Sequence, residues 1–73
     1  MTQVAAIGRP SEVAGLALAG ALVRPARTTE EARAAWQSLP AEVGIVILTE
    51  ETARAVAEER DRPRAPLSVV MPT

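Results

Sequence analysis

The chain has 73 residues, 48% of them hydrophobic, and a formal net charge of −1 from eight arginines and nine acidic residues. This length predicts one domain over residues 1–73, because a second hydrophobic core would not fit. The absence of cysteine and histidine excludes disulfides and the commonest metal ligands, and the charge balance lacks the basic excess of a nucleic-acid-binding protein.

The first expected elements are a short strand and an apolar helix. Residues 3–7 are almost entirely apolar, which predicts a buried strand, and residues 8–11 are typical of a turn. The helix is expected over residues 12–19, with Gly20 as its C-terminal cap. Because this helix is apolar nearly all round, its outer face would need a cover.

A brief second strand is expected at residues 21–23, followed by a second helix that starts at Thr28. Thr28 and Glu31 have the spacing of a capping box, in which each side chain accepts a free backbone N–H of the first turn. Pro40 is expected to stop this helix. Its apolar face, at helical spacing, consists of Ala32, Ala35, Trp36 and Leu39.

The central segment is residues 44–50, in which four large aliphatic residues follow one another at 45–48. A strand with no polar alternation is expected to be buried on both faces, as in a parallel sheet between helices. Thr49 is a good N-cap for the next helix. The inward stripe of that helix is expected to be Ala53, Val56 and Ala57.

Residues 59–66 are expected to form a polar, proline-broken connection to a last strand at residues 67–71. The order βαβαβαβ predicts a parallel sheet with right-handed crossovers. With the two apolar strands in the centre, the strand order is 2-1-3-4. The predicted fold is therefore an α/β three-layer sandwich of the flavodoxin or receiver type (Rossmann-like) with four strands.

No residue set specifies a reaction, so we expect no catalytic residues, no metal and no cofactor. The segment after Gly8 is neither G-x-G-x-x-G nor a Walker loop. A receiver-like phosphoacceptor needs an aspartate after the central strand and a lysine, whereas this chain has Thr49-Glu50 and no lysine. The cluster of Arg60, Arg62 and Arg64 is more often a solvated loop than a binding site, and Trp36 is more often core than interface.

Four segments resemble one family, the F subunits of the V-type and archaeal A-type rotary ATPases, in a bacterial form. These segments are Ala5-Ala6-Ile7-Gly8, Val13-Ala14-Gly15-Leu16-Ala17-Leu18-Ala19-Gly20, Val43-Gly44-Ile45-Val46-Ile47-Leu48-Thr49-Glu50 and Pro66-Leu67-Ser68-Val69-Val70-Met71-Pro72-Thr73. The resemblance implies a non-catalytic component of the central stalk, a rotor part that binds the D subunit and supports ATP synthesis or proton transport. The family's helical tail, which can reach the catalytic A/B head, would begin at Thr73, so regulation through that tail is not expected of these residues.

Parallel sheets usually bind partners at the carboxyl ends of their strands, and we expect the interface there. The candidates are Gly8, Arg9, Thr49, Glu50 and Pro72. The alternative is a small flavodoxin-like ligand-binding or signalling module that uses the same loops. The sequence shows no signal peptide and no run of ~20 apolar residues, which predicts a cytoplasmic protein, peripheral to the membrane as part of a complex.

Overall fold

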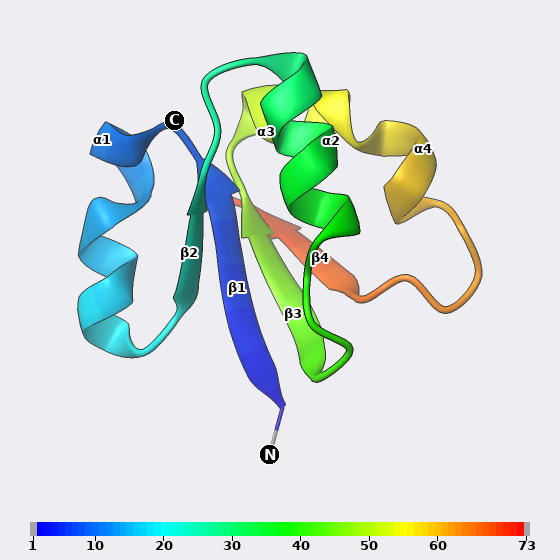
Figure 1. Ribbon diagram of the computed structural model, residues 1–73, viewed down its shortest axis with the longest axis horizontal. Helices are drawn as coiled ribbons and strands as arrows, with labels where there is room; N and C mark the ends of the chain where they lie inside the picture. The colour runs from blue at the N-terminus through cyan, green and yellow to red at the C-terminus, as the bar shows by residue number, and fades with distance from the viewer. Residues whose placement is uncertain (1, 73) are drawn as a thin grey trace.

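Within residues 2–72, which the computed structural model describes, four parallel strands form one sheet in the order β2-β1-β3-β4 (Figure 1). This confirms the predicted α/β class and strand order. The two predicted apolar strands are the central ones, and the two shorter strands lie at the edges. The strands are β1 (Gln3–Gly8), β2 (Leu22–Pro25), β3 (Val43–Leu48) and β4 (Leu67–Val70).

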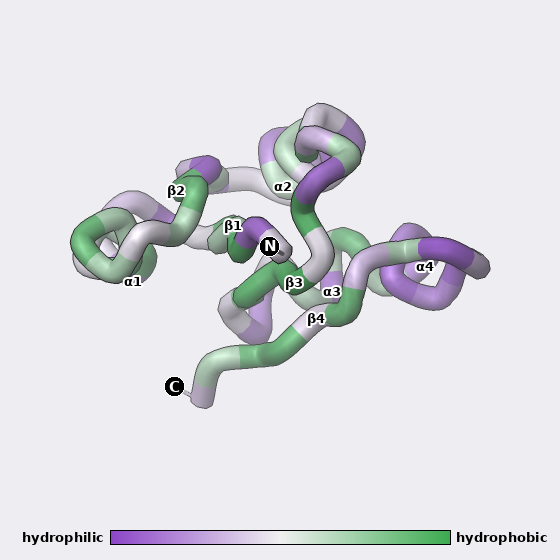
Figure 2. Tube along the Cα trace, turned by 90° about the horizontal axis from the view of Figure 1, so that it is seen from below, coloured by the Kyte–Doolittle hydropathy of each residue, from purple (hydrophilic) through white to green (hydrophobic). Residues whose placement is uncertain are grey.

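Helices lie on both sides of the sheet, with α1 on one side and α2 and α4 on the other (Figure 2). Within the described residues, one side of the sheet is covered by α2, α3 and α4, and the other side by α1 and η1 alone. The helical segments are α1 (Pro10–Val13), the 3-10 helix η1 (Ala14–Ala19), α2 (Thr29–Gln37), α3 (Glu50–Ala55) and α4 (Ala57–Arg60).

The first helix is not the single α-helix expected over residues 12–19. Its α-helical part ends at Val13, and η1 continues as a 3-10 helix to Ala19. Val13 is buried, but no residue of η1 is fully buried, so little packing holds that segment in α-helical form. Gly15 further lowers its helix propensity. Gly20 caps the segment with φ of 92°, as predicted.

The second helix is capped at both ends by side chains. Thr28 Oγ1 accepts a hydrogen bond from the Glu31 N–H at 3.1 Å, as predicted. In a complete capping box Glu31 would accept a hydrogen bond from the Thr28 N–H. Here Glu31 Oε1 accepts from the Arg27 N–H instead, at 2.7 Å. The helix ends at Gln37, and Ser38 Oγ donates to the Ala35 carbonyl at 3.1 Å.

The third helical region is longer than expected. Val56, with φ of −107° and ψ of 22°, separates α3 from α4, so Glu59 and Arg60 belong to a helix and not to a connecting loop. Beyond this break Ala57 is exposed and Glu59 is buried. The predicted inward stripe is therefore wrong at Ala57.

The hydrophobic core lies on one face of the sheet, which we call the covered face. There α2 and α3 pack over Ala5 and Ile7 of β1 and Val46 and Leu48 of β3, with Trp36 partly buried against the same cluster. Small alanines on both helices allow this close approach. The predicted core role of Trp36 is consistent with this position.

The opposite face is covered only in part. Residues of a strand alternate between faces, so Ile45 and Ile47 point away from the core cluster, and both are half-buried. Their partners in β4 are Leu67 and Val69, which are 73% and 56% exposed. We call Ile45, Ile47, Leu67 and Val69 the open face. The prediction that the central strand is buried on both sides is wrong there.

Candidate partner-binding site

The carboxyl ends of β1 and β3 meet at one edge of the sheet, where Gly8 lies beside Thr49. A Cβ atom added to Gly8 would lie 2.7 Å from Thr49 Cγ2 and 2.9 Å from Val13 Cγ1. Both distances are shorter than van der Waals contact allows. Glycine at this position therefore lets α1 and the start of α3 approach the end of β1 together.

Thr49 and Thr52 form a reciprocal capping box at the start of α3. The Thr52 N–H donates to Thr49 Oγ1 at 3.3 Å, and the Thr49 N–H donates to Thr52 Oγ1 at 3.0 Å. The Thr52 hydroxyl also lies 3.0 Å from the Ile7 carbonyl oxygen, to which it can donate. Because both threonines are buried, this network joins α3 to the end of β1.

Arg9 forms an ion pair across the top of this edge. Its Nη2 lies 3.2 Å from Glu51 Oε1, and the two side chains are 56% and 60% exposed. The hydrogen bond with Glu51 and its negative charge raise the pKa of Arg9, with a smaller contribution from Glu12. An ion pair this exposed contributes little to stability, so Arg9 can exchange Glu51 for a group on a partner at small cost.

The five residues predicted for the interface divide into two groups. Gly8 and Thr49 are buried and shape the edge from below. Arg9, Glu50 and Pro72 are exposed and lie where another molecule can reach them. The structure thus brings the end of β1 together with the start of α3, and the exposed charges there are of both signs.

The crevice at this edge is small. It has a volume of about 20 Å³ and is lined by ten residues, including Arg9, Arg27, Thr28 and Glu51. Small-molecule sites usually enclose roughly 300–1,000 Å³ and are mainly apolar. An adjacent hollow of about 330 Å³ is lined only by Arg9, Pro10, Ser11 and Arg27, which gives it no apolar wall beyond a proline.

The described residues 2–72 contain no group of three or more His, Cys, Asp or Glu side chains placed to hold a metal ion. In the same part of the chain, no helix combines the length and the apolar character needed to cross a bilayer.

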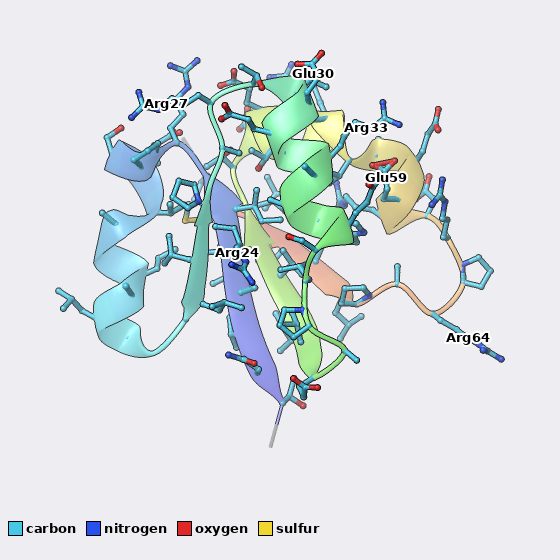
Figure 3. The ribbon with its side chains drawn as sticks, in the orientation of Figure 1. Arg24, Arg27, Glu30, Arg33, Glu59 and Arg64 are labelled. Atoms are coloured by element: carbon cyan, nitrogen blue, oxygen red, sulfur yellow. The ribbon has the colours of Figure 1, made fainter. Side chains whose placement is uncertain are left out.

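Sequence reasoning missed a buried carboxylate away from this edge. Glu59 of α4 is 3% exposed, and its Oε2 lies 3.6 Å from Arg33 Nε of α2, beyond hydrogen-bond distance (Figure 3). Arg60, in the cluster predicted to be a solvated loop, donates from Nε to Ser68 Oγ at 2.8 Å and ties α4 to β4. The helical spacing of Val56 and Glu59 was the available signal.

The sequence of the chain matches the profile of a known protein family. The profile of the family described as ATP synthase (F/14-kDa) subunit matches residues 4–73, which is nearly the whole chain. A comparison with individually curated proteins finds no significant match.

Proposed function

Because the chain belongs to the family of F (14-kDa) subunits of V/A-type ATP synthases, we propose that it is a rotor component of the central stalk that binds the D subunit. The family match over residues 4–73 is the observation that carries this proposal. In this role the chain turns with the D subunit on the cytoplasmic side of the membrane and takes part in rotary coupling without catalysing ATP synthesis or hydrolysis. Contact with the A/B head is indirect.

The proposed contact surface for the D subunit is the edge of the sheet at the carboxyl ends of β1 and β3, which we call the carboxyl edge. Arg9 and Glu50 supply exposed charges of opposite sign. Pro72 is also exposed and follows Met71, whose N–H donates to the Leu48 carbonyl at the end of β3. Gly8 and Thr49 act from beneath, because they keep α1 and α3 in place around the end of β1. Exposed charges on a rigid edge are suited to recognition, since charge complementarity steers a partner toward the edge and fixes its orientation.

Co-purification with the D subunit from the same genome tests this proposal. We expect a one-to-one complex by native mass spectrometry, and a higher melting temperature for the bound chain. Arg9→Glu is expected to weaken the complex by about tenfold, because a like charge then faces the groups that Arg9 would pair with. Arg62→Glu is the matched control, since Arg62 is also exposed but lies in the connection before β4.

The absence of a complex would refute the stalk assignment. The flavodoxin-like alternative would then be examined by thermal shift with FMN and ATP, where a concentration-dependent rise would support a ligand-binding role. The small crevice at the carboxyl edge argues against that outcome.

A further inference from the structure

The two edges of the sheet differ in how well they are protected against pairing with another strand. On β2, Arg24 supplies a charge and Pro25 has no backbone N–H, and both features discourage pairing at an edge. β4 contains neither a charged residue nor a proline. Its register with β3 runs without a shift from Leu67 to Val70, so it is a regular strand. Within residues 2–72, β4 is the last strand on its side of the sheet (Figure 2).

The outward backbone groups of β4 belong to Ser68 and Val70. The Met71 N–H donates to the Leu48 carbonyl at 2.7 Å, so the backbone of Met71 faces β3. Backbone polar groups alternate between the two sides of a strand, so Val69 also faces β3, whereas Ser68 and Val70 face away from it. Residues 67–70 make no backbone hydrogen bond outside the sheet to any other residue of the described range, 2–72. The N–H and C=O groups of this outer edge are therefore available to another strand.

An antiparallel copy of the same strand satisfies all of these groups. With Val69 opposite Val69 of the second copy, Ser68 of each copy lies opposite Val70 of the other. Both residues of such a pair donate an N–H and accept one in return. Moving the centre by one residue in either direction would require Pro66 or Pro72, which have no N–H to donate. The two prolines therefore favour the register centred on Val69.

The same register covers the exposed aliphatic side chains of β4. Val69, which is 56% exposed, meets its own copy across the two-fold axis. Leu67, which is 73% exposed, meets Met71 of the second copy on the same side of the sheet. A strand that pairs with itself brings identical side chains together, and like charges across such a pair are destabilising. β4 meets this condition because it is uncharged, whereas β2 carries Arg24.

We propose that the outer edge of β4 pairs antiparallel with β4 of a second copy of this chain, which joins two sheets into one. A second copy is the occupant because β4 complements itself in backbone hydrogen bonds, in aliphatic cover and in its lack of charge. The strand is short, so the buried area is smaller than that of stable complexes. We therefore expect a dimer that forms at high protein concentration and dissociates on dilution. This pairing goes beyond the stalk role and does not depend on it.

Disulfide trapping tests the register, because the chain has no cysteine of its own. Opposite residues that do not exchange hydrogen bonds have Cα atoms about 4.5 Å apart, a separation that a disulfide can span. Val69→Cys is therefore expected to cross-link to its own copy on mild oxidation. Leu67→Cys is the matched control, because it is more exposed but lies about 13 Å along the strand from its own copy. We expect it to cross-link more slowly by about tenfold or more.

Three results of this experiment would overturn the proposal. Equal rates for the two variants would mean random collision. The absence of a cross-link at residue 69 at millimolar concentration would leave the edge to a strand of another protein. Assemblies larger than a dimer would mean that β4 pairs with β2 of the next copy, because that contact does not close. Mixing Leu67→Cys with Met71→Cys is expected to give a mixed dimer, since these residues face each other in the proposed register.

Sedimentation equilibrium gives an independent readout without oxidation. Val69→Arg places two like charges at the two-fold axis and is expected to raise the dissociation constant of the dimer by about tenfold or more. Leu18→Arg is the control, because Leu18 is 94% exposed but lies on η1, which packs beside β2 at the other edge of the sheet. It is expected to leave the dissociation constant unchanged. A dimer that is equally sensitive to both changes would not be held by β4, and the proposal would fail.

Discussion

The two faces of the sheet have similar aliphatic strands beneath them but opposite surroundings. On the covered face, Val46 and Leu48 are fully buried under α2 and α3. On the open face, Ile45 and Ile47 of the same strand are half-buried, and their neighbours in β4 are largely exposed. An apolar strand therefore does not show by itself whether its two faces serve the same purpose. Here one face holds the fold together, and the other is available to a partner.

The largest expected difference between the faces comes from matched leucine truncations. Leu48→Ala removes a fully buried side chain and is expected to lower the free energy of unfolding by about 2–5 kcal/mol. Leu67→Ala removes a side chain that is 73% exposed and is expected to cost less than about 0.5 kcal/mol. Urea denaturation of both variants measures the contrast. Equal losses would mean that the isolated chain already covers its open face.

The next prediction concerns the point where α1 meets the end of β1. Gly8→Ala forces Thr49 and Val13 apart, and overpacking of this kind is expected to cost about 1–3 kcal/mol. Gly15→Ala is the control, because a Cβ atom there meets nothing within 4 Å and its φ is not positive. That change is expected to raise stability by about 0.4–1 kcal/mol. The melting temperatures of the two variants measure this contrast. A shift of both melting temperatures in the same direction would contradict the steric role of Gly8.

A smaller loss of stability is expected from breaking the ion pair between α2 and α4. Arg33→Ala leaves the buried Glu59 carboxylate without its counter-charge. Arg33 is half exposed, so water screens the pair, and the expected loss is about 1–2 kcal/mol. The exposed Arg62→Ala should stay within about 0.5 kcal/mol of the natural chain. If both arginines behaved alike in chemical denaturation, the ion pair would have no role in the fold.

The smallest effect on stability is expected at the carboxyl edge. Arg9→Gln removes an exposed ion pair with Glu51 and should leave the unfolding midpoint unchanged within experimental error. The same variant should bind the D subunit more weakly if Arg9 contacts it. A measurable loss of stability would show that Arg9 has a structural role and would weaken its use as an interface probe.

Much of this architecture follows from short-range patterns in the sequence. The alternation of apolar strands with helical segments was sufficient for the class and the strand order. Thr28, Thr49 and Gly20 were identified as caps because capping depends on residue type and local spacing. Such features need no knowledge of distant contacts.

The errors arose where a distant contact, or its absence, decides the conformation. Residues 14–19 have the composition of an α-helix, but they lack the packing that would hold them in that form. Glu59 was assigned to a polar loop because its partner, Arg33, is far away in sequence. For the interface, the sequence predicted which edge to examine, but it did not distinguish buried Gly8 and Thr49 from exposed Arg9.

The strand order also determines when the chain can fold during synthesis. The central strand β1 is synthesised before β3, with which it pairs. Ala5 of β1 lies opposite Val46 of β3, about 40 residues later in the sequence. The edge of β3 is then protected only when Leu67–Val70 has emerged from the ribosome. Until β3 has been made, β1 can pair only with β2, and the edge of β1 that β3 covers stays open to other chains.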